Sequence, residues 1–166
     1  MDAKKLTKLR KDLRTFLDVV VGTRDHPRRR RWCEAYVLGV LLDGQRKSVE
    51  PMAKRLQAID QSDADYEQSL QQFVDQSPWD EQAVLAGLQA WIARQFNADG
   101  CLIIDDTGFP KPGERSVGVA RQDTGTLGKI ASCQVAVTLH LATDRDVVGL
   151  DARLDLPEAW TDDPLR

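Results

Sequence analysis

The sequence predicts an α+β protein in which a helical region, residues 1–97, precedes an antiparallel sheet in residues 98–166. Apolar side chains recur at helical spacing through the first region, with charged residues between them. At Cys101 the spacing changes, and apolar residues then alternate with polar ones as they do in half-buried strands. Four predicted strands in succession with short connections favour an antiparallel meander. The boundary between the two regions is expected near Asn97–Gly100.

The helical region is predicted to begin with two helices. The first spans Lys4–Val21 and presents leucines and a phenylalanine on one face. The second follows His26-Pro27, because proline is tolerated in the first helical turn, and it ends at Asp43-Gly44. From Trp32 to Leu42 this helix is apolar almost all round, which predicts packing on several sides.

Three further helices are predicted before the sheet. Ser48 is placed to cap the first of them, and Ser77-Pro-Trp-Asp80 has the spacing of a capping box for the last. The last helix is expected to stop before Asn97. The predicted inward stripes are, in order, Met52, Leu56 and Ile59; Tyr66, Leu70, Phe73 and Val74; and Val84, Leu88, Trp91, Ile92 and Phe96.

The predicted sheet begins with the strand Cys101–Asp106. A turn rich in proline and glycine follows, and then a second strand, Ser116–Gln122. Strict alternation between Cys133 and Ala142 gives the clearest strand of the chain. Thr143–Asp146 is predicted to be a turn, and alternation resumes in Val148–Leu154.

Composition is that of an ordinary soluble protein: 42% hydrophobic and 30% charged residues in a chain of 166. No apolar run approaches the ~20 residues that span a bilayer, and the start of the chain is too basic and polar for a signal peptide. The three cysteines are isolated and lack the spacing of a zinc site, which favours free thiols in a reducing compartment. They are Cys33, Cys101 and Cys133.

Charge is distributed unevenly along the chain. Residues 1–31 contain eleven lysines and arginines against four aspartates, which leaves 12 basic and 22 acidic residues in the remainder. The basic segment ends in the run Arg28–Arg31. Two interpretations remain open: an arm that contacts nucleic-acid phosphates, or a solvated helix face with a positive run before a helix.

The apolar run that begins at Cys101 ends in two adjacent carboxylates, Asp105 and Asp106. Carboxylates at the end of a core strand are costly unless they hold a cation or take part in chemistry. Because successive side chains of a strand point to opposite faces, the two cannot form one chelate by adjacency. The alternative is that both cap the turn that follows.

Four motifs follow one another from this point. They are Cys101-Leu-Ile-Ile-Asp-Asp-Thr-Gly-Phe-Pro-Lys-Pro-Gly113, Ser116-Val-Gly-Val-Ala-Arg-Gln122, Gly125-Thr-Leu-Gly-Lys129 and Leu156-Pro-Glu-Ala-Trp-Thr-Asp-Asp-Pro164. In this order they resemble the DDE transposases of bacterial insertion sequences, most closely the insertion sequence 701 group. The resemblance implies an RNase H-like fold of the retroviral-integrase type. Residues 98–166 would form its antiparallel first half, and full-length relatives continue beyond it, so a truncated N-terminal part is expected.

The same resemblance implies a catalytic role for Asp105 as the first metal-binding aspartate, with Asp106 and Thr107 in support. In the family, a second aspartate and a glutamate complete a site for two Mg²⁺ ions, which Mn²⁺ can replace. Two such ions roughly 4 Å apart activate the attacking hydroxyl and stabilise the leaving oxygen of a DNA phosphodiester. The later ligands are not expected in this chain, so the two-metal site is predicted only for a full-length protein.

DNA contacts are implied for Lys111, Arg121 and Lys129, which lie in or beside the loops after the catalytic strand, and for the run Arg28–Arg31. Solvated loop charge is the alternative interpretation of these residues. No nucleotide cofactor is expected, because Gly125-Thr-Leu-Gly128 lacks the spacing of a phosphate-binding loop. His140 is expected to be hydrogen-bonded on a half-solvated face of the clearest strand.

The function expected from the resemblance is that of a transposase fragment, incomplete for catalysis, whose partners are the DNA of transposon ends and targets. A second copy or a full-length transposase is a further expected partner, and the expected location is the bacterial cytoplasm at the nucleoid. A non-catalytic DNA-binding or regulatory protein and a decayed remnant remain as alternatives. Without a later strand beside it, the strand 101–106 is expected to expose an unpaired edge and to promote self-association.

Overall fold

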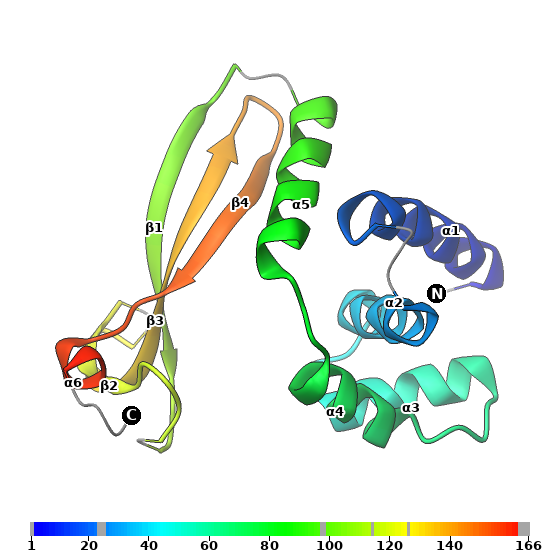
Figure 1. Cartoon of the computed structure of the whole chain (residues 1–166), viewed down its shortest axis with the longest axis horizontal. Helices are drawn as coiled ribbons and strands as arrows, with labels where there is room; N and C mark the ends of the chain where they lie inside the picture. Colours follow the sequence, from blue (N-terminus) through cyan, green and yellow to red (C-terminus); the bar gives the residue numbers. More distant parts are fainter. Residues whose placement is uncertain (1, 23–25, 97–98, 114, 126, 163–166) are drawn as a thin grey trace. The chain divides into compact units, whose positions relative to one another are not determined.

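The structure, a computed structural model of the chain, describes residues 2–22, 26–96, 99–113, 115–125 and 127–162. Within these ranges five helices precede a four-stranded antiparallel sheet and a sixth, short helix follows it, which confirms the predicted α+β class (Figure 1). The chain forms two compact units, residues 1–91 and residues 92–166. No helix in the described ranges is long and apolar enough to cross a membrane.

The predicted helices are present in the expected order. They are α1 Ala3–Val20, α2 Pro27–Leu41, α3 Val49–Asp60, α4 Tyr66–Gln76 and α5 Glu81–Gln95. The predicted capping box at Ser77 is wrong, because Ser77 ends α4 and residues 77–80 are not helical. Asp80 caps α5 instead, and its carboxylate accepts the Ala83 N–H at 2.9 Å. The start of α5 therefore lies at Glu81.

The core of the helical unit lies between α1, α2, α3 and α4. Met52, Leu56 and Leu70 are fully buried there, as their stripes predict. The prediction that Ile59 and Val74 point inward is wrong, because both side chains are exposed. The middle of α2 is packed on several sides, as predicted, because it contacts α1, α3 and α4 and no residue from Trp32 to Gly39 is exposed. Val40 and Leu41, at the end of the helix, are exposed. The core cluster consists of Leu13, Leu17, Trp32, Cys33, Leu38, Leu42, Ala53, Leu56, Tyr66, Leu70 and Phe73.

Tyr66 joins this core to a polar network. Its ring meets Trp32 edge to face at a centroid distance of 5.2 Å. Its hydroxyl donates a hydrogen bond of 2.5 Å to Asp60. The Asp60 carboxylate also forms an ion pair with the guanidinium of Arg10. Burial, together with the hydrogen bond to Asp60, raises the pKa of Tyr66 above its usual value. The neutral phenol is therefore the form that the folded state favours.

The sheet consists of β1 Cys101–Pro110, β2 Ala120–Thr124, β3 Lys129–Ala142 and β4 Val147–Leu154. All of its pairing is with β3: β1 lies along one edge of β3, and β2 and β4 lie along the other. The predicted meander is wrong at its first connection, because β1 pairs with β3 and not with β2. Thr143–Asp146 forms the predicted turn between β3 and β4, closed by a hydrogen bond of 2.9 Å.

The connection from β1 to β2 differs from the predicted strand at 116–122. The Val119 N–H donates to the Ser116 carbonyl, and Gly118 between them has a φ of +74°, so this stretch is a turn. β2 begins only at Ala120. A left-handed residue of this kind favours glycine, and the strand pattern of apolar residues at 117 and 119 conceals the turn.

The segment after β4 is fixed to this turn. The Asp155 N–H donates to the Val135 carbonyl at 2.8 Å, and the short helix α6, Glu158–Thr161, follows. The indole N–H of Trp160 donates to the Val119 carbonyl at 2.8 Å. A Cβ at Gly118 would lie 2.9 Å from the Asp155 carbonyl oxygen, so the close approach requires glycine.

The outer edge of β1 has no strand partner among the described residues. Leu102 and Ile104 on this strand are 65% and 73% exposed, so the strand presents large apolar side chains to solvent. An unpaired edge with exposed apolar side chains favours pairing with another chain. The unpaired edge of β1 agrees with the open edge expected from the sequence.

Raising the pH should destabilise the protein through Tyr66. Its folded-state pKa is raised above the unfolded value of about 10. The stabilisation is therefore complete below pH of about 10 and is lost as the pH rises through the folded pKa. Tyr66→Phe should flatten this part of the pH profile in urea unfolding and cost about 1 kcal/mol at neutral pH, whereas Tyr36→Phe should leave the profile as in the unmodified chain. A profile that Tyr66→Phe does not alter would contradict this.

Ile104→Lys should reduce self-association of the purified protein, because it places a charge on the exposed face and edge of β1. Sedimentation velocity over a concentration series measures the effect. Leu41→Lys is the matched control, since Leu41 is an equally apolar exposed residue on α2. A protein that stays monomeric at all concentrations would show that the β1 edge does not drive association.

Candidate functional site

Asp105 and Asp106 lie in the middle of β1 and not at its end. The predicted turn at Gly108 is wrong, because β1 stays paired with β3 as far as Pro110. Asp105 is opposite Thr138 and Asp106 is opposite Val137. The Thr138 hydroxyl also donates to the Asp105 carbonyl at 3.2 Å, which ties the two strands together at this point.

The two aspartates belong to opposite faces of the sheet, as strand alternation predicts. On the face of Asp105 the neighbouring positions include Thr107, Thr138 and His140, which are polar, and also Ile103 and Ala136, which are apolar. The face of Asp106 carries Leu102, Ile104, Val137, Leu139 and Leu141, together with the charged residues Asp151 and Arg153 of β4. The polar groups beside Asp105 suit a hydrated cation or a phosphate.

The residues that the structure describes do not assemble a two-metal site. No group of three or more histidine, cysteine, aspartate or glutamate side chains that could hold a metal occurs among them. Asp105 is exposed and is the one carboxylate of β1 on its face of the sheet. His140 lies diagonally across from it, opposite Ile103, and the alternation of β3 already placed His140 on a polar face. Their proximity depends on strand pairing, which the sequence alone did not reveal.

Gly108 serves close packing and not a turn. A Cβ on Gly108 would lie 2.6 Å from the Thr124 hydroxyl oxygen and 2.9 Å from the Thr124 Cβ. Thr124 is 1% exposed and is the last residue of β2. The absence of a side chain at Gly108 therefore lets the end of β2 approach β1, three residues after Asp105.

Lys111 and Arg121 lie on either side of Ser132. The Lys111 N–H donates to the Ser132 carbonyl at 2.9 Å, and Arg121 on β2 pairs with the same residue. Because neighbouring strands lie about 4.8 Å apart, the backbones of Lys111 and Arg121 are about 10 Å from each other across β3. Ser132 is six residues from Thr138 on β3, so this pair is about 20 Å from Asp105 along the strand.

Lys129 does not join this pair. It begins β3, opposite Thr124, and its position on the alternating strand assigns it to the face opposite that of Ser132. The structure therefore brings Lys111 and Arg121 together, and it separates both of them from Lys129 and from Asp105.

The four arginines at 28–31 begin α2 and diverge around it. Arg28 donates to the Gln72 amide oxygen at 3.3 Å, and Arg29 donates to the Pro78 carbonyl at 2.7 Å. Arg30 forms an ion pair with Asp18. The Arg31 guanidinium lies over the Trp32 ring, 5.0 Å from its centroid. Because consecutive helical residues point about 100° apart, the run does not form one basic patch.

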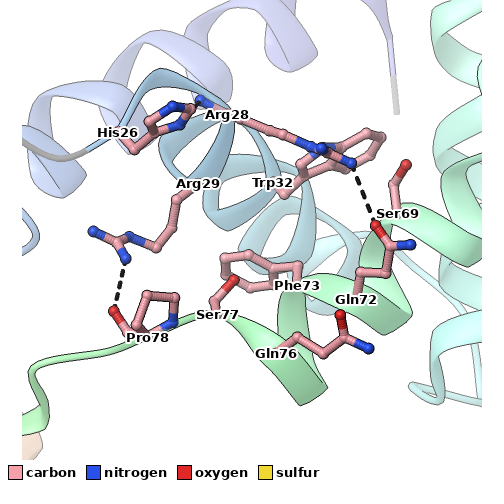
Figure 2. A pocket seen from close by; sticks show the side chains of 10 residues that line it. All are labelled: His26, Arg28, Arg29, Trp32, Ser69, Gln72, Phe73, Gln76, Ser77 and Pro78. Carbon is pink, nitrogen blue, oxygen red and sulfur yellow. Dashed lines mark hydrogen bonds between the residues drawn. The ribbon is translucent and has the colours of Figure 1, made fainter.

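Arg28 and Arg29 line a pocket of about 390 Å³ between the start of α2 and the end of α4 (Figure 2). We call it the α2–α4 pocket. It is formed by His26, Arg28, Arg29, Trp32, Ser69, Gln72, Phe73, Gln76, Ser77 and Pro78. Helical spacing assigned Trp32 and Phe73 to the core and did not reveal the pocket. A signal was nonetheless present, since a basic run and a glutamine-rich helix flank these aromatics.

A protein-family model described as DDE superfamily endonuclease matches residues 16–166. No curated protein and no solved structure matches the chain.

The approach of Gly108 to Thr124 predicts that Gly108→Ala destabilises the protein by about 1–3 kcal/mol through overpacking. Thermal and urea unfolding measure the change. Gly125→Ala is the control, because a Cβ there meets no atom within 4 Å. In the double variant Gly108→Ala with Thr124→Ala, the two costs should be less than additive. Strictly additive costs would show that the two residues are not in contact.

Proposed function

Because the chain belongs to the DDE superfamily endonucleases, matched over residues 16–166, we propose that it takes part in DNA transposition. The proposed protein is an insertion-sequence transposase of the 701 group, acting at the nucleoid of a bacterial cytoplasm, and this chain forms its N-terminal part. The order of the four sequence motifs between Cys101 and Pro164 supports this assignment. The proposed substrate is the DNA of transposon ends and targets.

The single observation that carries the proposal is the placement of Asp105. β1 holds Asp105 exposed on one face of the sheet, beside Thr138 and diagonal to His140. Asp106 lies on the opposite face, which it shares with Asp151 and Arg153 of β4. We assign metal ligation to Asp105 for this reason, and we assign support of the strand to Asp106 and Thr107.

Metal chemistry in this superfamily requires more than one carboxylate. Bound Mg²⁺ or Mn²⁺ ions would polarise the phosphodiester and activate the attacking hydroxyl. Magnesium binds to oxygen ligands and retains several waters, so each ion needs only a few carboxylates, but a pair needs more than Asp105. Within the described ranges Asp105 belongs to no group of three or more side chains that could hold a metal. We propose that the remaining ligands come from residues outside these ranges or from another chain.

The pair Lys111 and Arg121 supports a DNA contact on the same sheet as Asp105. Both cations flank Ser132, and such a pair suits two phosphates of one strand. Their separation of about 20 Å from Asp105 along β3 would place these contacts away from the scissile bond. Lys129 and the arginines 28–31 are proposed to contact DNA elsewhere.

A second candidate function is that of a non-catalytic DNA-binding or regulatory protein. The absence of a metal-binding cluster from the part of the chain that the structure describes favours it. Such a protein would occupy transposon ends, or would form mixed oligomers with a full-length transposase. It makes the same DNA contacts as the first candidate and differs from it in the role of Asp105.

Substituting Asp105 should remove the metal response of the sheet. In the unmodified protein, Mn²⁺ should broaden the amide signals of residues 103–107 and 138–140 in NMR spectra, because the ion is paramagnetic and sits on the Asp105 carboxylate. Asp105→Asn should abolish this broadening, whereas Asp106→Asn on the opposite face should retain it. Equal broadening in both variants would overturn the assignment of Asp105.

Nicking of labelled duplex DNA, with and without Mg²⁺, separates the two functions. The chain alone should bind DNA with an affinity that falls steeply with salt, and it should not nick. Addition of a full-length relative should then yield mixed complexes that bind transposon ends. Magnesium-dependent nicking by the chain alone, lost in Asp105→Asn, would overturn the proposal that its site is incomplete.

A further inference from the structure

The α2–α4 pocket has an aromatic floor. Trp32 and Phe73 line the pocket and are 7% and 8% exposed. Both rings are held by aromatic neighbours, because Tyr66 meets Trp32 edge to face and Trp79 meets Phe73 in the same way at 5.2 Å. Figure 2 shows the Phe73 ring between the α2 residues and the amide side chains of α4. A rigid aromatic surface of this kind suits a flat, π-bonded ligand.

The walls of the pocket are polar, and the described residues that form them include no acid. Gln72 and Gln76 of α4 and the hydroxyls of Ser69 and Ser77 supply both donors and acceptors. These groups suit the hydrogen-bonding edge of a nucleobase, whose donors and acceptors lie in the plane of the ring. None of the ten lining residues is a carboxylate, so an anionic ligand meets no repulsion from them.

The rim of the pocket provides the positive charge. Arg28 is exposed and donates to the neutral amide of Gln72, and it forms no ion pair with a carboxylate among the described residues. Its charge is therefore available to a phosphate. Arg29 has a positioning role, because it donates to the Pro78 carbonyl and lies over Trp79 at 5.6 Å. It fixes the wall formed by the α4–α5 loop.

We propose that the α2–α4 pocket binds one unpaired nucleotide of DNA, with its base against Trp32 and Phe73 and its phosphate on Arg28. The volume of about 390 Å³ is in the range of small-ligand sites, about 300–1,000 Å³, and is too small for a duplex. A nucleotide must leave the helical stack to enter, which costs least where the base is already unpaired. The identification of the polymer as DNA rests on the proposed function. The fit of the pocket to a base and a phosphate is argued from its own residues and does not depend on that function.

The test uses the whole chain and a DNA duplex that carries one unpaired 2-aminopurine, a fluorescent analogue of adenine. Two matched DNAs serve as references: one with the same base paired opposite thymine, and one with an unpaired abasic site. The duplex with the unpaired base should bind about tenfold more tightly than either reference, because only it offers a free base for stacking. Its fluorescence should fall on binding.

Two variants of equal bulk locate the effect. Ser69→Phe fills the pocket from α4 and should abolish the tenfold preference, whereas Gln68→Phe adds the same ring outside the lining and should retain it. Circular dichroism establishes that both variants are folded. Arg28→Gln should weaken binding of the unpaired-base DNA and reduce the salt dependence by about one phosphate contact.

If the three DNAs bound with equal affinity, and if Ser69→Phe left these affinities unchanged, the pocket proposal would be overturned. The proposal that the chain binds DNA would still stand. If the chain bound none of the DNAs, the proposed function would fall, and the nucleotide dAMP would then decide on the pocket. In NMR spectra dAMP should shift the Trp32 indole N–H signal, and inorganic phosphate alone should not. No shift with dAMP would overturn the pocket proposal as well.

Discussion

The long strand β3 is the constraint on which the second unit depends. All three other strands of the sheet pair with it, β1 on one edge and β2 and β4 on the other. Fourteen residues of one strand thereby set the position of every polar group considered in the sheet. Asp105 faces Thr138 because of this pairing, and Lys111 meets Arg121 across Ser132 for the same reason. A shift of one residue in the register would transfer Asp105 to the opposite face of the sheet.

Local patterns in the sequence predicted those features that depend on local chemistry. Helical periodicity located α1 to α5, and alternation placed Asp105 and Asp106 on opposite faces. Features set by distant residues were not predictable in this way. Gly108 resembles a turn residue beside Pro110, yet it lies inside β1 because Thr124, sixteen residues later, needs the space. The partner of β1 was also invisible, since alternation shows that a strand has two faces but not which strand lies beside it.

The basic run at the start of α2 illustrates the same limit for charge. Four adjacent arginines predict a basic patch, but helical geometry directs them to different partners: Gln72, Pro78, Asp18 and the ring of Trp32. A sequence count cannot separate a cation that holds a loop from one that is available to a ligand. The separation needs tertiary contacts, and in this chain it divides Arg29, which holds the α4–α5 loop, from Arg28, whose neutral partner leaves its charge uncompensated.

The hydrogen bond from the Trp160 indole to the Val119 carbonyl has a consequence for the order in which the chain folds during synthesis. The turn that precedes β2 gains this anchor only after residue 160 has left the ribosome. The core of the helical unit, by contrast, is built from residues 13–73 and needs nothing from the sheet. The helices can therefore fold first, as N-terminal units generally do, whereas β1 cannot pair with β3 until β3 has been made. During that interval the apolar run Leu102–Ile104 has no strand beside it and is open to pairing with another chain.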